Sequence, residues 1–215
     1  MHESSASIGE VDWIIISLKS YSLDEIPKLI KPLLKKKKTT RVLAIMNGLI
    51  DEQLAKLLID NNNGELPCRA IYGGMAFICS NRIAPGVVDH SYAGALTCGL
   101  SASALSSSSS SNKEEDKLAL DELWSNYTKV EYLYESSLLR GRWIKNCWNL
   151  PFNGLSVAMG CITVDKIVND IGLRELADKI MDDTILIANT ELKHRGFTNE
   201  DYFLGDKLVS FFYSK

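Results

Sequence analysis

The sequence has few residues of the types that hold metals or form disulfides. Its 215 residues include three histidines, which are scattered, and five cysteines, which form no CxxC or CxxxxC group. This spacing predicts that the chain binds no metal. An odd number of cysteines, four of them inside apolar runs, favours reduced and buried thiols in an intracellular protein.

The chain also lacks an excess of charge of either sign and any long apolar run. A formal net charge of -3 at pH 7 favours neither a nucleic-acid binder nor a surface for anionic lipid. The one basic cluster, Lys35–Lys38, is typical of a solvated turn. No apolar run approaches the ~18 residues that span a membrane, and the first ten residues lack the features of a signal peptide. We therefore expect a cytoplasmic protein without nucleic-acid or membrane partners.

Apolar strands alternate with amphipathic helices in the first half of the chain. The continuous apolar run over 12–18 predicts a strand covered on both faces. The elements predicted after it are, in chain order, a helix begun by a Ser22/Glu25 capping box, a strand over 41–49, a helix from Asp51 and a strand from Arg69. This order is the pattern of a parallel sheet.

The pattern changes after Pro85. Two short β-rich pieces, 86–94 and 95–100, indicate a hairpin or meander. The serine-rich segment 101–117 breaks all periodicity and is typical of a flexible surface insertion.

The chain is mostly helical by its pattern from about Leu118 onward, apart from a short strand within 128–134. Helices are predicted over 137–159, 164–169 and 173–193. The sequence thus predicts an α/β domain over 1–126, which contains the insertion, and an all-helical domain over 127–215.

Polar or small residues follow three of the predicted strands. Lys19, the pair Asn47-Gly48 and the pair Gly73-Gly74 each close an apolar strand. Ligands of open α/β sheets bind beyond the carboxyl ends of parallel strands, so a lysine there could meet a phosphate and an asparagine could meet an amide or a ribose hydroxyl. Turn formation by the glycines and solvation of the lysine explain these residues about equally well.

The segment WIKNCWNLPFNGLS, 143–156, sets three polar residues at four-residue spacing. Lys145, Asn149 and Asn153 advance by about 40° per step along a helix, so they share one narrow stripe of a helix whose other residues are largely apolar. Burial favours the neutral form of a lysine and lowers its pKa. A lysine with two carboxamides beside it suits a carbonyl substrate that bears a carboxylate. The alternative is a helix between domains whose polar groups make structural contacts.

With these residues the chain resembles the ketopantoate reductase (2-dehydropantoate 2-reductase) family. The matching pieces, in family order, are DWIIISLKSY, VLAIMNGLIDEQL, YGGMAFICSNRIAPGVVDHS and WIKNCWNLPFNGLS. The Lys-x₃-Asn-x₃-Asn spacing after a tryptophan-containing helix start is the most specific of them. The resemblance covers residues 11–213 apart from the serine-rich insertion.

The resemblance implies a partial Rossmann-like, NADP-binding sheet domain followed by an all-helical substrate domain. The implied activity is the reduction of the small 2-oxoacid 2-dehydropantoate by NADPH to (R)-pantoate, on the way to coenzyme A. In the family pattern Lys145 is the catalytic proton donor, while Asn149 and Asn153 bind the substrate. Thr163 stands where some members have a further substrate-binding asparagine.

Cofactor contacts are implied at three further positions. Asn47 corresponds to an asparagine near the reacting centre, and Lys19 to a lysine on the ribose-phosphate side. Ser80 falls at a small residue that touches the cofactor, although Cys79 fits that position equally well.

Two parts of the family pattern are missing from these 215 residues. There is no GxGxxG loop to cradle a pyrophosphate, and the late serine and glutamate of the substrate site do not occur. We therefore expect a middle portion of the reductase, with a helical domain that is incomplete at its end. The alternatives are a non-catalytic binding module of the same fold, or a reductase of another 2-oxoacid, and a homodimer is compatible with any of these.

Overall fold

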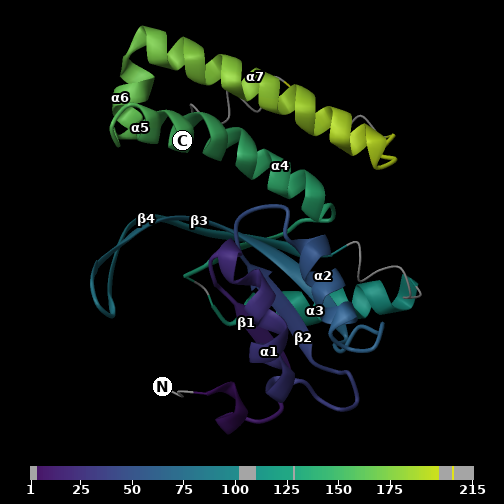
Figure 1. Ribbon diagram of the computed structural model, residues 1–215. Helices are drawn as coiled ribbons and strands as arrows, with labels where there is room; N and C mark the ends of the chain where they lie inside the picture. Colours follow the sequence, from purple (N-terminus) through teal and green to yellow (C-terminus); the bar gives the residue numbers. More distant parts are fainter. Residues whose placement is uncertain (1–3, 102–109, 128, 199–204, 206–215) are drawn as a thin grey trace. The chain divides into compact units, whose positions relative to one another are not determined.

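The structure, a computed structural model, describes residues 4–101, 110–127, 129–198 and 205. They belong to two compact units, Met1–Leu138 and Leu139–Lys215 (Figure 1). The first unit is a sheet flanked by helices and the second is helical, which confirms the predicted fold class. Within the described residues, no helix combines the length and the apolar character needed to cross a membrane.

A five-stranded sheet organises the first unit, and its strands lie side by side in chain order. They are β1 (Trp13–Ile16), β2 (Arg41–Ile45), β3 (Ala70–Ala84), β4 (Val87–Leu100) and β5 (Glu131–Tyr134). β1, β2 and β3 are parallel, β4 is antiparallel to β3, and β5 is parallel to β4. The parallel part predicted from the strand–helix order is confirmed. The boundary predicted at 126/127 precedes the division between the units, because β5 still pairs with the sheet.

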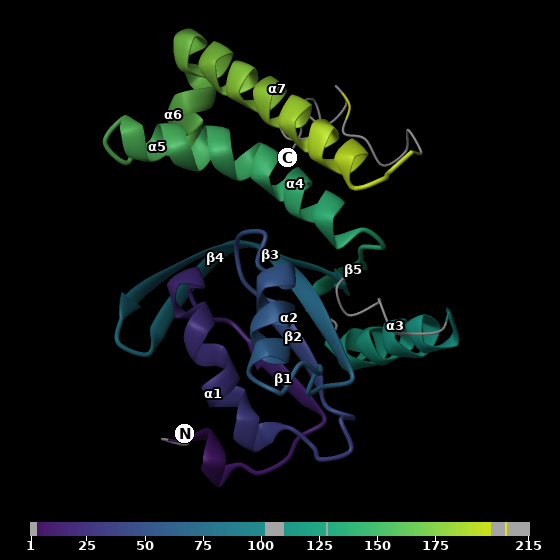
Figure 2. The same cartoon turned by 45° about the vertical axis from the view of Figure 1, so that its right-hand side comes forward.

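Helices cover the two faces of this sheet. One face carries η2 (Ser20–Glu25), α1 (Ile26–Ile30), η3 (Lys31–Leu33) and α2 (Asp51–Asp60). Figure 2 shows α1 and α2 over the parallel strands. On the other face α3 (Ser110–Ser125) packs through Leu120 against Leu43 and Tyr72. The cores on the two faces hold the central strands β2 and β3 between them.

The first helical segment differs from its prediction. It consists of short pieces, because Pro27 stands at the start of α1 and Pro32 at the start of η3, and a proline cannot continue a helix that needs its N–H. The predicted capping box is wrong. η2 begins directly after Lys19, and no side chain caps it.

β1 lies at the edge of the sheet, and this position overturns the expectation of two covered faces. Ile14 and Ile16 are buried against α1 and α2, whereas Ile15 is 49 % exposed. Within the described residues β1 pairs only with β2. The outer backbone groups of β1 and the face that carries Ile15 are thus open to a further element.

β3 and β4 form one long hairpin rather than a strand followed by two short pieces. The turn is Pro85-Gly86, where Gly86 has φ +74°, and the pairing runs from Tyr72↔Leu100 to Ala84↔Val87 with three register shifts. The far half of the hairpin extends past the shorter neighbouring strands as a curved ribbon (Figure 1). Residues 78–91 of this ribbon are exposed.

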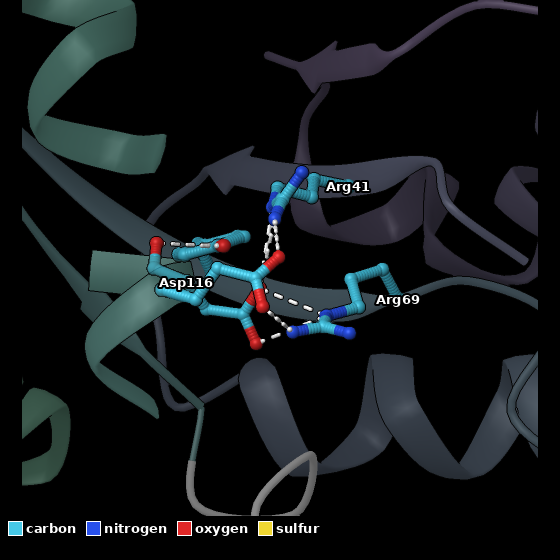
Figure 3. Close-up of polar contacts among 5 residues, drawn as sticks. Arg41, Arg69 and Asp116 are labelled. Carbon is cyan, nitrogen blue, oxygen red and sulfur yellow. Dashed lines mark hydrogen bonds and ion pairs between the residues drawn. The ribbon is translucent and has the colours of Figure 1, made fainter. Parts of the chain in front are cut away.

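The serine-rich insertion is partly helical, which corrects the prediction for 101–117. Residues 102–109 lie outside the described ranges, but α3 begins at Ser110. Its Asp116 is buried and accepts hydrogen bonds from Arg41 and Arg69, which lie at the amino-terminal ends of β2 and β3 (Figure 3). Tyr72 also donates its hydroxyl to the Asp116 carbonyl at 2.9 Å. These contacts hold α3 on the sheet, and composition alone does not reveal them.

The helical unit contains α4 (Leu138–Trp148), the π-helical turn η5 (Asn149–Asn153), α5 (Gly154–Ala158), α6 (Val164–Asn169) and α7 (Ile171–His194). These helices agree with the predicted ranges. α4, η5 and α5 form a continuous rod, alongside which α7 runs (Figure 2). Cys147, Phe152 and Met181 are fully buried in the core between them. Because this core occupies one side of the rod, a site for chemistry can lie only on the other side.

Candidate active site

The α4–η5–α5 rod positions the predicted lysine–asparagine face. An α-helix would need an N–H at position 151 to bond the carbonyl of Cys147, and Pro151 has none. The chain passes this point in the π turn η5, which takes in both asparagines. Pro151 and Phe152 are buried, so the turn is anchored from inside the unit. Single π turns inside α-helices are frequent at functional sites.

Lys145 lies on α4, one turn before η5, and its side chain is partly buried. Burial lowers the pKa of Lys145, and the charge of Arg142 lowers it further. Both causes disfavour the ammonium form. An ammonium in this environment releases a proton more readily than a solvated lysine does, as a general acid needs.

Asn149 and Asn153 lie together at the two ends of η5. The Nδ2 of Asn153 donates to the Oδ1 of Asn149 at 3.4 Å, a long contact at an exposed position. Asn149 is partly buried and Asn153 is exposed. The face predicted from the four-residue spacing is therefore real for this pair. It leaves amide donors and acceptors that a bound ligand could use.

Thr163 is the N-cap residue of the short helix α6, and its side chain makes no capping hydrogen bond. It is exposed. A threonine before a helix normally serves as a cap, so its hydroxyl is open to solvent or a ligand. Nothing in the contacts of Thr163 joins it to Lys145 or the asparagine pair.

Two predicted cofactor residues follow the carboxyl ends of parallel strands. Lys19 is exposed, comes after β1 and precedes η2. Asn47 is exposed, two residues after the end of β2, and is followed by Gly48 at φ +95°. Because β1 and β2 are parallel neighbours, both residues lie at the same edge of the sheet. Their placement agrees with the rule for ligands of open α/β sheets.

The third strand end was predicted wrongly. Gly73 and Gly74 pair with Ala44 and Ile45 inside β3, which continues to Ala84. A Cβ on Gly74 would lie 2.9 Å from Cγ1 of Ile45, so this glycine serves the close packing of the strands. Gly74 pairs with Ile45, the last residue of β2, so the glycine pair lies where the parallel part of β3 ends.

Ser80 and Cys79 are both exposed on β3, in the far half of the hairpin. Ser80 pairs with His90 and Cys79 pairs with Tyr92, and the register of the hairpin shifts between the two. Buried Cys68 and Cys147 are free thiols, as predicted for most of the cysteines, and burial raises their pKa to about 12.

Sequence reasoning missed Arg142. This arginine stands three residues before Lys145 on α4 and is 4 % exposed. The available signal was a cation one turn away from the candidate lysine in a largely apolar helix. The burial of Arg142 depends on tertiary packing, so the spacing of residues along the helix does not predict it.

The candidate residues form two groups, one in each unit. Lys145, Arg142, Asn149 and Asn153 share the rod of the helical unit, whereas Lys19 and Asn47 share one edge of the sheet. The rod offers an acidified ammonium beside two amides, which fits protonation of a carbonyl oxygen. The sheet edge offers a cation and an amide, which fit part of a nucleotide.

Two family models match the chain. The model described as ketopantoate reductase PanE/ApbA matches residues 1–103, and the one described as the ketopantoate reductase PanE/ApbA C terminal matches residues 137–210. The first match lies within the sheet unit, and the second covers most of the helical unit.

Known reductases are similar to this chain. The 2-dehydropantoate 2-reductase of Nostoc sp. is 30 % identical over 177 residues, which are 82 % of this chain and 51 % of that protein. The crystal structure of 2-dehydropantoate 2-reductase from Geobacter metallireducens has a TM-score of 0.74 and 28 % identity, over 97 % of this chain and 61 % of that one. The 2-dehydropantoate 2-reductase from Methylococcus capsulatus, at 21 % identity and TM-score 0.69 over 98 % and 59 %, shares the fold. The chain therefore spans about half the length of the curated relative.

Proposed function

The chain belongs to the ketopantoate reductase family, and we propose that it supplies the proton donor and the substrate amides for the NADPH-dependent reduction of 2-dehydropantoate to (R)-pantoate. The observation that carries this proposal is Lys145, partly buried with a lowered pKa one turn before the hydrogen-bonded asparagine pair. The 28–30 % identity to named 2-dehydropantoate 2-reductases supports the choice of substrate.

The proposed chemistry adds two hydrogens across the C2 carbonyl of a 2-oxoacid. NADPH, when bound, would supply a hydride to the carbonyl carbon. The N–H bond of the Lys145 ammonium breaks as an O–H bond forms on the carbonyl oxygen, so the product is the 2-hydroxyacid and Lys145 is left neutral. Asn149 and Asn153 hold the substrate by hydrogen bonds while this transfer takes place.

The residues at the sheet edge fit part of a dinucleotide. By the family pattern we assign Lys19 to the ribose-phosphate side, Asn47 to the side near the reacting centre and Ser80 to a contact along the hairpin, and all three are exposed. Gly48, at φ +95°, allows a ligand to approach the backbone after β2. A pyrophosphate cradle is not among these residues, because the sequence contains no GxGxxG.

A cradle of this kind would fit beyond the open edge of β1. The connections from β1 to β2 and from β2 to β3 place α1 and α2 on one face. Strands added beyond β1 by connections of the same hand would place their helices on the opposite face. That face carries the half-exposed Ile15. The carboxyl end of β1, where Lys19 lies, would then be the point at which the strand order reverses and nucleotides bind.

The proposal is tested by NADPH oxidation with ketopantoate, using the protein in its complete reading frame. Lys145→Ala is expected to reduce turnover by about 10²–10⁴-fold, the usual contribution of a general acid. The control is Lys166→Ala, which removes an exposed lysine of α6 in the same unit and should leave turnover unchanged. Turnover of Lys145→Ala within a few-fold of wild type would sink the assignment.

A second function, a non-catalytic binding module, is favoured by one observation, the missing pyrophosphate loop. Calorimetry of the 215-residue chain with NADPH separates the two proposals, since tight binding counts against a module that has lost the cofactor. A third arm, a panel of 2-oxoacids of different size, tests the choice of substrate. Faster turnover of another 2-oxoacid would replace ketopantoate but keep the reaction.

A further inference from the structure

A cavity of about 260 Å³ lies in the sheet unit, on the face that carries α1 and α2 (Figure 2). Its lining comes from α1, η3, the end of α2 and the loops that follow. Leu34 precedes β2 and Pro67 precedes β3, so the cavity lies toward the amino ends of these strands. The candidate cofactor residues Lys19 and Asn47 follow the carboxyl ends of β1 and β2. The cavity is therefore separate from the edge assigned to the nucleotide.

Two lysines line this cavity. Lys28 on α1 and Lys31 at the start of η3 stand one helical turn apart, and both are exposed. Like charges at this spacing repel each other. In the part of the chain that the structure describes, neither lysine forms an ion pair. The acidic residues at the end of α2 and in the loop after it bind other lysines, in the pairs Lys56–Asp60 and Lys38–Glu65.

Two asparagines line the cavity at the end of α2. The Nδ2 of Asn61 donates to the carbonyl of Leu57, and the Nδ2 of Asn62 donates to the carbonyl of Glu65, both at 2.9 Å. These bonds fix the orientation of both amides. No donor among the described residues reaches either Oδ1 atom. The two oxygens are therefore acceptors for the hydroxyl groups of a ligand.

The rest of the lining is apolar. Leu58 is 2 % exposed, and Pro27, Leu34 and Pro67 are partly buried. Small-molecule sites combine such an apolar lining with a few polar groups that orient the ligand. The volume lies just below the range of about 300–1,000 Å³ for pockets that hold drug-sized ligands. The cavity is thus too small for a dinucleotide and suits a ligand of a few carbon atoms.

We propose that this cavity binds a phosphate monoester of a short, hydroxylated carbon chain. Such a phosphate carries a charge of about −1.5 to −2 at pH 7, which complements the two ammonium groups of Lys28 and Lys31. The carbon chain packs on Leu58, and its hydroxyl groups donate to the Oδ1 atoms of Asn61 and Asn62. The site takes no part in the reduction set out above, so the inference does not depend on the proposed function.

The test is calorimetry of the 215-residue chain with glycerol 3-phosphate, with amide chemical shifts to locate the probe. The shifts are expected to change in 28–34 and 57–62. The double variant Lys28→Met/Lys31→Met should weaken binding by about tenfold, because two charged contacts are lost. The matched control is Lys36→Met/Lys37→Met, which removes two exposed lysines of the same connection that do not line the cavity. It should bind as wild type does.

Further probes test each part of the ligand. Glycerol lacks the charge and should not bind, and propyl phosphate lacks the hydroxyl groups and should bind more weakly than glycerol 3-phosphate. Inorganic phosphate that binds as tightly as glycerol 3-phosphate would overturn the claim that the carbon chain is recognised. If the double variant does not fold, Lys28→Met and Lys31→Met are measured singly, and each should weaken binding by about threefold.

The variant Lys19→Met separates the cavity from the nucleotide edge. Because Lys19 follows the carboxyl end of β1, its loss should leave the affinity for glycerol 3-phosphate unchanged. Loss of binding in this variant would place the probe at the nucleotide edge and overturn the proposal. Absence of binding to the wild type, or an equal loss in the two double variants, would overturn it as well. Ketopantoate reduction enters none of these outcomes, so the proposed function stands or falls separately.

Discussion

Replacing Asp116 by alanine is expected to destabilise the sheet unit by about 3 kcal/mol. The Asp116 side chain is 6 % exposed and lies 3.1 Å from Nη2 of Arg41 and 3.0 Å from Nε of Arg69 (Figure 3). Removing one partner of a buried ion pair costs about 3–5 kcal/mol, because the remaining charges stay buried without it. The two arginines are 18 % and 28 % exposed, so they regain some hydration. We therefore expect the lower end of that range.

The assay is urea unfolding, with hydrogen exchange of peptides from β2, β3 and α3 to show which elements open. The control is Glu115→Ala. Glu115 contacts the same arginines at 3.5 and 3.0 Å but is 60 % exposed, and exposed pairs contribute about 0–1 kcal/mol. The difference between the two variants isolates burial, since the partners are identical. Equal losses of stability would refute the view that the buried carboxylate holds α3 on the sheet.

Three other outcomes follow from the contacts. Gly99→Ala places a Cβ 2.2 Å from the carbonyl oxygen of Glu135, so it should reduce the free energy of unfolding by about 3 kcal/mol or more. A melting temperature equal to that of wild type would contradict that contact. Lys145→Met should stabilise the folded chain at neutral pH, because the lowered pKa means that folding disfavours the protonated form. That gain should disappear as the pH rises through the pKa of the unfolded lysine, so the melting temperatures of the variant and the wild type should become equal at high pH. A difference that stays constant with pH would contradict the burial of the charge. Alkylation followed by mass spectrometry should modify exposed thiols first and the buried ones only after unfolding, the exposed pair being Cys79 and Cys161 and the buried set Cys68, Cys98 and Cys147.

The order of strands and helices could be predicted because it depends on local periodicity. The position of a strand within the sheet could not. The three isoleucines of β1 read as a central strand, yet Ile15 is half exposed because no strand of the described part lies beyond β1. The burial of a strand depends on the elements that pack beside it, and the residues of the strand do not identify those elements.

Non-local partners explain the other differences. The serine run is typical of a flexible loop, but the acidic residues after it meet Arg41 and Arg69, which stand 75 and 47 residues earlier than Asp116. With these distant partners, α3 begins at Ser110, within the segment whose composition predicts a loop. The two short pieces predicted after Pro85, 86–94 and 95–100, are one strand, and the turn at Pro85-Gly86 returns β4 along β3.

The lysine–asparagine face was recognisable in the sequence because it breaks local rules. A proline inside a helix and a lysine with two amides among apolar residues each disfavour a regular α-helix. The structure resolves the first by the π turn η5 and leaves the others beside it. Residues that conflict with their own secondary structure are expected where function has been selected at the expense of stability.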